Sequence, residues 1–262
     1  MIKPKKSLGQ NFLIDKDIIN KITSVVEIKD KNILEIGPGK GSLTSSILEK
    51  NPSKIIVIEK DEILADFLQK NFGSKLKIIT EDILKINENL LHDNLLTVFG
   101  NLPYNISTEI LCKWILNIKN QNFWFDNLVL MFQKEVADRI IAKFNTKDYG
   151  RLSILSNWKL DIKKICDVKP ASFFPKPKID SSVLLLKPKL NFFSLKDPKN
   201  LEKITRTFFM HRRKMLKKPY NIIFNDNFHV ANKLKIDLNL RPQNLNFDTY
   251  YKLTEEFENL RS

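Results

Sequence analysis

Three of the chain's seven glycines fall in a single turn, Glu35-Ile36-Gly37-Pro38-Gly39-Lys40-Gly41, and no other feature limits the fold as strongly. Residues 31–36 are typical of a short buried strand, and residues 42–50 are typical of a helix. Glycine permits positive φ angles and lets the backbone approach a ligand closely. The strand, turn and helix therefore predict a Rossmann-like sheet with a ligand at the turn, although a purely structural turn is the alternative.

The spacing of these glycines separates two kinds of cofactor. A dinucleotide-binding turn has the pattern G-x-G-x-x-G. Here position 42 is Ser, so the third glycine comes one residue too early for that pattern. The arrangement Glu-x-Gly-x-Gly-x-Gly instead resembles the first motif of S-adenosylmethionine-dependent methyltransferases. We therefore include Gly37 and Gly39 among the residues expected to bind a cofactor.

Acidic residues follow the next two predicted strands. The apolar run 54–58 ends in Glu59, about twenty residues after the glycine turn, where a Rossmann-like sheet places an acid that binds ribose hydroxyls. A solvated charge at a strand end is the alternative for Glu59. A third strand, 76–80, precedes Glu81 and Asp82, and we expect Asp82, more than Glu81, to accept a hydrogen bond from the exocyclic amine of an adenine.

A fourth predicted strand, 95–99, leads into Asn101-Leu102-Pro103-Tyr104. These residues supply an amide that accepts hydrogen bonds, a rigid turn, and a ring able to stack on a base. An ordinary exit from a strand is the alternative. Because strands alternate with helices, we predict a parallel, doubly wound α/β sheet that brings Asn101 to Tyr104 to the same edge as the glycines and acids.

The chain is strongly basic, with a formal charge of +14 and a pI near 9.6. Basic surfaces bind polyanions through phosphate neutralisation and counterion release, so a nucleic acid is the favoured partner and an anionic membrane surface the competitor. Residues 1–185 carry 28 Lys and Arg against 22 Asp and Glu, whereas residues 186–262 carry 16 against 8. We predict a methyltransferase domain over residues 1–190 and a helical RNA-binding or ribosome-binding domain over residues 191–262.

Several basic residues stand beside aromatic or loop segments that suit an RNA contact. Two adjacent phenylalanines, Phe173 and Phe174, precede a proline and lysine-rich stretch; one is expected to anchor the loop and the other to stack on a base. A second cluster, His211 to Lys214, is expected on the later turns of a helix over 201–216, where a solvated face is the alternative. The candidate RNA-binding residues are Lys5, Lys6, Arg151, Lys176, Lys178, Arg212, Arg213 and Lys214.

Other features of the sequence argue against further classes of site. Cys112 and Cys166 are too few and too far apart for a metal cluster or a disulfide framework, and His211 lacks ligand-type neighbours, so no metal is expected. The basic N-terminus lacks an apolar signal segment, and no membrane span is predicted. A cytoplasmic location is the resulting expectation.

Taken together, the motifs resemble the bacterial small-subunit (16S) rRNA adenine dimethyltransferase family, also called dimethyladenosine transferases, over nearly the whole chain. The matching segments are Gly9–Leu13, Glu35–Gly39, Gly100–Ser107, Gln133–Val136, Tyr149–Ser153 and Phe173–Ser181. The segment Arg241–Leu245, followed by Tyr250 and Leu253, resembles the small-subunit branch more than the related large-subunit methyltransferases.

This resemblance implies a cofactor, a substrate and site residues. Asn11 and Leu13 are expected to close over S-adenosylmethionine, and Asn101 to contact both cofactor and base. Asn101 and Leu102 accept the hydrogen bonds of the adenine amine, Pro103 fixes the Leu102 carbonyl, and Phe173 stacks on the base opposite Tyr104. Phe174 is the weaker stacking candidate.

The implied reaction is the N6,N6-dimethylation of two adjacent adenosines in a hairpin near the 3′ end of the small-subunit rRNA, in an immature 30S subunit and by a monomeric enzyme. A non-enzymatic assembly factor and a large-subunit methyltransferase are the alternatives. One departure from the family concerns Lys217-Lys218-Pro219-Tyr220. Pro219 is expected to end or kink a helix there and so to disturb its RNA contacts.

Overall fold

The computed structural model describes residues 4–5, 8–92, 94–118 and 122–261. It contains two compact units. The first comprises residues 1–113, 119–137 and 161–188, and the second comprises residues 114–118, 138–160 and 189–262. The last segment of the second unit thus begins at residue 189, close to the predicted boundary at residue 190. It also takes in 114–118 and 138–160, which the prediction assigned to the first domain. Residues 151–159 pack with the C-terminal helices, and Lys159 donates hydrogen bonds to the carbonyls of Ile115 and Ile118.

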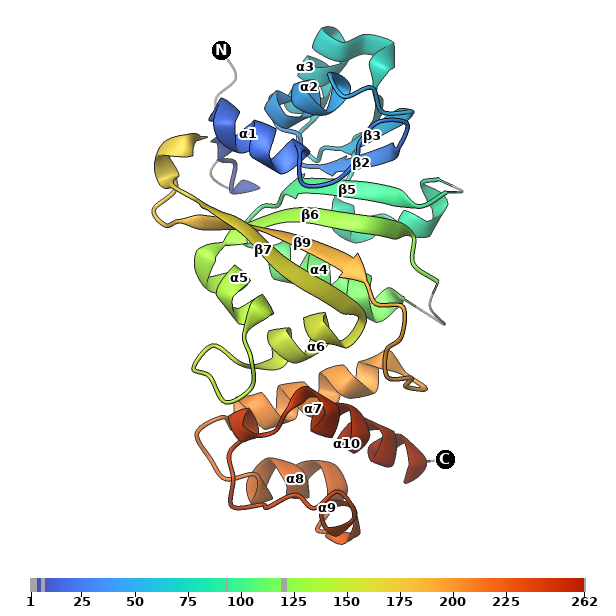
Figure 1. Cartoon of the computed structure of the whole chain (residues 1–262), viewed down its shortest axis with the longest axis vertical. Helices are drawn as coiled ribbons and strands as arrows, with labels where there is room; N and C mark the ends of the chain where they lie inside the picture. The colour runs from blue at the N-terminus through green and yellow to red at the C-terminus, as the bar shows by residue number, and fades with distance from the viewer. Residues whose placement is uncertain (1–3, 6–7, 93, 119–121, 262) are drawn as a thin grey trace. The chain divides into compact units, whose positions relative to one another are not determined.

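The first unit is built on a seven-stranded sheet with the order β4-β3-β2-β5-β6-β9-β7 (Figure 1). The strands are β2 (Asn32–Ile36), β3 (Lys54–Ile58), β4 (Lys77–Ile79), β5 (Leu96–Asn101), β6 (Phe125–Gln133), β7 (Leu160–Val168) and β9 (Ser181–Pro188). The pairs from β4 through β6 are all parallel, as predicted. The sheet as a whole is mixed, because β9 follows a loop instead of a crossover helix and pairs antiparallel with β6.

Helices alternate with these strands. They are α1 (Lys16–Thr23), α2 (Ser42–Leu48), α3 (Glu62–Phe72), α4 (Ser107–Asn117) and α5 (Lys134–Ile141). Asp15 is the N-cap of α1 and accepts hydrogen bonds from two backbone N–H groups of the first turn. A separate two-stranded sheet joins β1 (Phe12–Leu13) to β8 (Phe173–Phe174).

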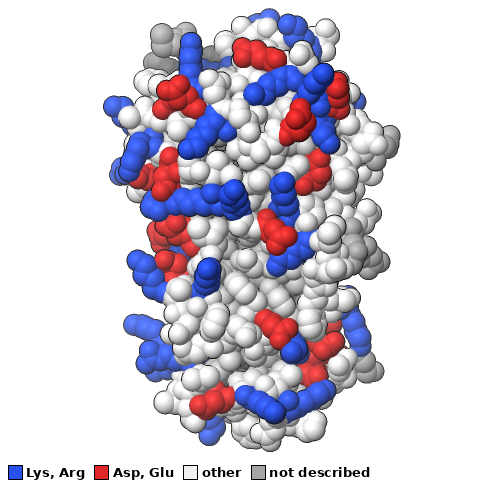
Figure 2. Space-filling model, viewed as in Figure 1, with Lys and Arg blue, Asp and Glu red and all other residues white. Residues whose placement is uncertain are grey.

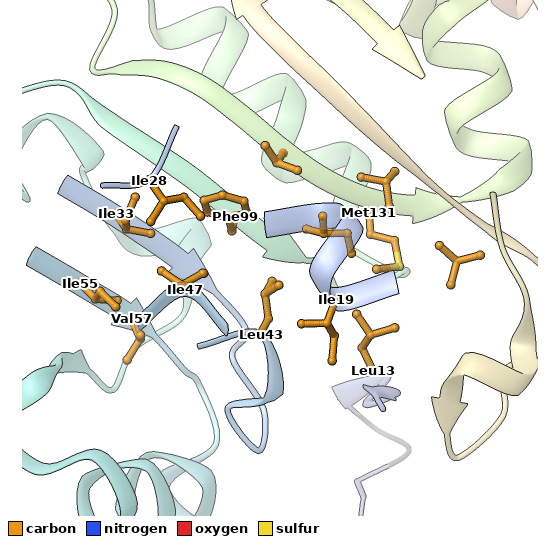
Figure 3. Close-up of a cluster of buried hydrophobic side chains, with 14 of the residues drawn as sticks. Leu13, Ile19, Ile28, Ile33, Leu43, Ile47, Ile55, Val57, Phe99 and Met131 are labelled. Carbon is orange, nitrogen blue, oxygen red and sulfur yellow. The ribbon is translucent and has the colours of Figure 1, made fainter. Parts of the chain in front are cut away.

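The core of this unit lies between the sheet and the helices that precede and follow β2. Ile33, Ile55 and Val57 of the strands are buried with Ile47 of α2 in one cluster. Figure 3 shows these side chains on one face of the sheet, with Leu43 and Ile19 continuing the cluster toward Leu13. Leu13 is therefore part of the packed core, and its burial anchors the N-terminal segment beside the carboxyl ends of the strands.

The second unit contains α6 (Arg151–Lys159), α7 (Pro198–Met210), α8 (Lys217–Phe224), α9 (His229–Lys233) and α10 (Phe247–Asn259). Aromatic rings join these helices: Tyr250 of α10 lies with its centroid 5.7 Å from that of Phe208, and Tyr149 lies 5.4 Å from Phe247. Across the described part of residues 189–262 every regular element is helical, as predicted. None of the helices in the described residues is long and apolar enough to cross a bilayer.

Two predictions about this unit are wrong. The helix expected over 201–216 ends at Met210, so Arg212, Arg213 and Lys214 lie in the turn before α8. Pro219 neither ends nor kinks a helix, because it lies in the first turn of α8. The N–H groups of a first turn have no intrahelical acceptor, so proline removes nothing that this helix uses.

Candidate active site

A single pocket opens at the carboxyl ends of β2, β3 and β5. It is lined by the N-terminal segment, the glycine turn and the residues that follow three strands. Its walls include ten residues predicted from the sequence: Asn11, Leu13, Gly37, Gly39, Glu59, Asp82, Asn101, Leu102, Pro103 and Tyr104. They come together because the carboxyl ends of parallel strands share one edge of the sheet.

The glycine turn requires its glycines for two separate reasons. Gly37 and Gly39 have φ angles of +65° and +59°, which side-chain-bearing residues rarely adopt. At Gly39 a Cβ atom would also lie 2.8 Å from the ring of Phe12, which is too close for a real contact. The turn therefore packs directly against the N-terminal segment, and Lys40 places its ammonium 5.0 Å from the centroid of the same ring.

Glu59 is held at the end of β3 by backbone groups. Its Oε1 accepts a hydrogen bond from the Asp61 N–H at 2.9 Å, and its Oε2 accepts one from the Gly39 N–H at 3.3 Å. The side chain is only 7% exposed, and burial raises the pKa of its carboxyl despite these two hydrogen bonds. A fixed, mostly dry carboxylate with remaining acceptor sites on the pocket wall suits hydroxyl donors on a ligand.

Glu35 is a second buried acid on the same wall, and our sequence reasoning gave it no separate role. It lies at the end of β2, and burial raises the pKa of its carboxyl to about 7, against a hydrogen bond from the Thr44 hydroxyl at 2.7 Å. The available signal was its position as the first residue of the glycine motif.

Asp82 lines the pocket but is already engaged. Its Oδ1 accepts the Leu84 N–H at 3.0 Å, and its Oδ2 pairs with the Lys60 ammonium at 2.8 Å. The Lys60 hydrogen bond holds the pKa of the Asp82 carboxyl below its usual range. Lys60 competes with any ligand amine for Oδ2, and the sequence carried no sign of this pair. Glu81 lines the same wall.

Asn101 links the fourth strand to the N-terminal segment. Its Nδ2 donates to the Asn11 carbonyl at 2.9 Å. This bond uses one of the two N–H groups of Nδ2 and fixes the orientation of the amide, and the Oδ1 acceptor remains for a ligand. Asn11 and Asn101 are thus in direct contact on the pocket wall.

Tyr104 follows three residues later and is fixed by a residue that we had not singled out. Its hydroxyl and the hydroxyl of Ser181, which is fully buried at the start of β9, lie 2.6 Å apart. Burial raises the pKa of Tyr104 although the Ser181 hydrogen bond opposes this, so the phenol is neutral near pH 7. The hydrogen bond fixes the direction of a ring on the pocket wall.

The structure differs from the prediction for the two phenylalanines. Phe173 is 1% exposed and lies in the hydrophobic core, opposite Leu13 in the β1–β8 ladder, whereas Phe174 is 54% exposed. Successive side chains of a strand point to opposite faces, so only one of the two can be solvent-facing. One of them anchors the loop, as expected, but it is Phe173, which presents no free face to a base in this conformation.

The candidate RNA-binding residues fall into two groups. Lys176, Lys178, Arg213 and Lys214 are exposed. Three others have partners within the protein: Lys5 pairs with Asp61 at 2.8 Å, Arg151 pairs with Glu202 at 2.5 Å, and Arg212 donates to the carbonyls of Thr146 and Lys147. Lys6 lies outside the described residues. Figure 2 shows Lys and Arg side chains spread over the face in view, with Asp and Glu between them.

The parallel strands, the glycine turn with its positive φ angles, and the strand-end acids define the class of protein: a methyltransferase with a Rossmann-like sheet. Solved structures agree with this fold. A dimethyladenosine transferase from Plasmodium falciparum has a TM-score of 0.80 and 27% identity, with 95% of this chain and 98% of that chain covered. The 23S rRNA methyltransferase ErmE, at 20% identity and a TM-score of 0.68, shares the fold over 95% of this chain and 100% of its own.

Sequence comparison then gives the family. The profile of the family described as "Ribosomal RNA adenine dimethylase" matches residues 1–259. The "Ribosomal RNA small subunit methyltransferase A" of Pelagibacter ubique is 65% identical over 260 residues, which is 99% of each chain. A protein of the same name from a Wolbachia strain of Drosophila simulans is 44% identical over 98% of this chain and 95% of its own. The chain belongs to the ribosomal RNA adenine dimethylase family and is a methyltransferase enzyme.

Proposed function

We propose that this enzyme dimethylates N6 of two adjacent adenosines in a hairpin loop near the 3′ end of the small-subunit rRNA, using S-adenosylmethionine, during assembly of the 30S subunit. The observation that carries the proposal is the pocket in which the glycine turn, Glu59, Asp82 and Asn101–Tyr104 meet, within a chain that matches the family over residues 1–259. The small-subunit substrate is favoured over the large-subunit one because both curated relatives described above are named for the small subunit.

The pocket residues fit the cofactor that the family implies. Glu59 is positioned by two backbone N–H groups and retains acceptor sites for the two ribose hydroxyls. Gly37 and Gly39 leave room for the methionine part, and Asn11 and Leu13 cover it. Asp82 would receive the adenine amine in exchange for the Lys60 ammonium. When bound, S-adenosylmethionine supplies an electrophilic methyl group on sulfur.

The chain's own residues then prepare the target nitrogen. The N6 lone pair of adenine is delocalised into the ring, so N6 is a poor nucleophile until it becomes pyramidal. Asn101 Oδ1 and the Leu102 carbonyl can accept its two N–H bonds and favour that geometry, while Pro103 restricts the direction of the carbonyl. Positioning of this kind accelerates a displacement without a strong base.

Aromatic stacking offsets the unstacking of the flipped adenosine. Tyr104 supplies one ring, with its hydroxyl fixed by Ser181. Phe173 can complete a sandwich only if β8 moves away from the core, since its ring is buried. After one transfer a single N–H remains, so the monomethylated base must rotate or rebind before the second transfer.

The RNA itself is expected to contact the exposed lysines and arginines of the two units. Lys176 and Lys178 flank the Phe173–Phe174 loop, and Arg213 and Lys214 lie in the turn between α7 and α8. Arg151 and Arg212 hold neighbouring elements of the second unit in place and would contribute to RNA binding mainly by shaping the surface of that unit. A monomeric enzyme in the cytoplasm, acting on the immature subunit, completes the proposal.

The test is transfer of labelled methyl groups from S-adenosylmethionine to immature small subunits, with the methylated adenines mapped by primer extension. Two adjacent dimethylated adenosines near the 3′ end are expected. Asn101→Ala should abolish transfer and leave subunit affinity nearly unchanged, because Asn101 acts on the amine and not on the RNA backbone. Subunits that bind but remain unlabelled would favour a non-enzymatic assembly factor, and label in the large subunit would reject the proposed substrate.

A further inference from the structure

Asp61 lies two residues after Glu59 and is 3% exposed, yet the reaction proposed above gives it no role. Its carboxylate accepts three hydrogen bonds. The Ile63 N–H, at 3.1 Å from Oδ1, explains Asp61 as the N-cap of α3. The other two come from the N-terminal segment: Lys5 Nζ lies 2.8 Å from Oδ1, and Gln10 Nε2 lies 2.9 Å from Oδ2.

Gln10 uses both ends of its amide at this point. Its Nε2 donates to Asp61, and its Oε1 accepts the Lys5 backbone N–H at 2.7 Å. The next residue, Asn11, is fixed separately, because its carbonyl accepts the hydrogen bond from Asn101. The pocket-lining residues 11–13 are therefore held on one side by Asn101 and on the other by the Gln10–Asp61 contact.

Asp61 also touches the acid on the pocket wall. Its N–H donates to Glu59 Oε1 at 2.9 Å, while Glu59 Oε2 accepts the Gly39 N–H. One residue thus connects the N-terminal segment, the Glu59 carboxylate and, through it, the glycine turn. A hydrogen-bonded chain of this kind aligns several ligand-contacting groups at once.

We propose that Asp61 is a positioning residue for the cofactor: through Gln10 and Lys5 it holds Asn11–Leu13 against the pocket, and through its N–H it sets the orientation of Glu59. This inference rests on the proposed function, since it takes the pocket to bind S-adenosylmethionine. It also gives Lys5 a different role from the one predicted. Lys5 neutralises a buried carboxylate beside Glu59 and does not serve as a phosphate contact.

The charge balance around Asp61 supports this role for Lys5. Burial alone would raise the pKa of Asp61, but the hydrogen bonds from Lys5 and Gln10 outweigh burial and lower it. Asp61 therefore stays ionised beside Glu59. Without Lys5, two neighbouring buried carboxylates would repel each other, and the N-terminal segment would lose its attachment.

The experiment measures S-adenosylmethionine affinity by calorimetry for the wild type and for Asp61→Asn, Gln10→Ala and Lys5→Met. Asparagine caps a helix as well as aspartate, so Asp61→Asn preserves the N-cap of α3. We expect about tenfold weaker binding for Asp61→Asn and several-fold weaker binding for the other two, in line with the loss of hydrogen bonds to a charged group. The turnover number at saturating cofactor should stay within about twofold, because a uniform binding contribution changes KM alone. Adding Lys5→Met to Asp61→Asn should weaken binding no further.

Lys31→Met is the matched control. Lys31 also pairs with a carboxylate, that of Asp126 at 3.8 Å. It lies directly before β2, at the amino end of the strand, whereas the pocket lies at the carboxyl ends. Its replacement should leave cofactor affinity unchanged. If all three variants bind the cofactor as the wild type does, the inference is overturned. A fall of about one in the salt slope of subunit binding for Lys5→Met would then make Lys5 a phosphate contact. A wild-type protein that binds no S-adenosylmethionine would reject the proposed function itself.

Discussion

The hydrogen bond between Tyr104 and Ser181 offers a sharp test of the proposed base-binding site. The two hydroxyls lie 2.6 Å apart, and Ser181 is fully buried. Ser181→Ala removes the partner without changing the ring, whereas Tyr104→Phe removes the other hydroxyl and keeps the ring available for stacking. Because both substitutions break the same bond, their effects should not add.

The magnitude follows from the type of bond. A neutral intramolecular hydrogen bond contributes about 0.5–1.5 kcal/mol, and an unpaired buried hydroxyl loses about 1–3 kcal/mol of solvation. In Ser181→Ala the Tyr104 hydroxyl loses its partner. Because this hydroxyl is only half-buried, the free-energy cost should lie near the lower limit of the solvation range. We therefore expect a fall of about five- to tenfold in kcat/KM for subunits, equal to about 1–1.4 kcal/mol. The double variant should be no worse than Ser181→Ala.

The assay is methyl transfer to immature small subunits at saturating S-adenosylmethionine, with urea unfolding of each variant alongside. Ser182→Ala is the matched control. Ser182 is the next residue in β9, is equally buried, and donates to Asp167 Oδ1 at 2.5 Å, but its side chain points to the other face of the strand. Because its partner is a carboxylate, Ser182→Ala should lower stability at least as much as Ser181→Ala and leave kcat/KM unchanged. Additive losses for Tyr104→Phe and Ser181→Ala, or an equal loss for Ser182→Ala, would refute the reasoning.

Three further predictions follow from the pocket and its surroundings. Glu59→Gln should weaken S-adenosylmethionine binding by about tenfold or more in calorimetry. The amide NH2 of glutamine would face one of the two backbone N–H groups that now donate to Glu59, and two donors cannot bond to each other. The substitution also removes charge-assisted hydrogen bonds of about 1.5–3 kcal/mol. Unchanged affinity would place the ribose elsewhere. The pKa of Glu35 in the folded protein, about 7, lies above its usual value of 4.5, so the folded state binds more protons between these values and stability falls as pH rises through this window. Glu35→Gln should therefore raise the free energy of unfolding at pH 8, by up to about 3 kcal/mol, and leave it nearly unchanged at pH 4, as urea unfolding at the two pH values would measure. Lys176→Met should lower the salt slope of subunit binding by about one in filter binding, since one exposed cation is lost, and an unchanged slope would remove Lys176 from the RNA surface.

The shared edge of the sheet could be predicted because it depends on a few local rules. Glycines in the first turn, acids after the next two strands, and Asn101 after the fourth each follow an apolar run. Parallel strands then bring all of them to one side. Ten of the residues that line the pocket were accordingly predicted as site residues, whereas others on its walls, Glu35 and Lys60 among them, received no role of their own.

What the sequence could not supply are contacts between side chains distant along the chain. Nothing near Asp82 in the sequence points to Lys60, and nothing near Tyr104 points to Ser181. The choice between Phe173 and Phe174 depends on which residue faces the core in a ladder with Phe12–Leu13, and that register is set by tertiary packing. The end of α7 at Met210 was missed because helical periodicity continued into a segment that instead forms a turn.

Pro219 also affects the ensemble of unfolded chains. A proline there restricts its own φ angle, so the unfolded polypeptide has fewer states to lose on folding. In the first turn of α8 the native backbone accepts the proline ring without a lost hydrogen bond. The residue that looked most disruptive in the C-terminal helices therefore favours folding, by about 0.4–1 kcal/mol, through conformational entropy rather than through any contact it makes.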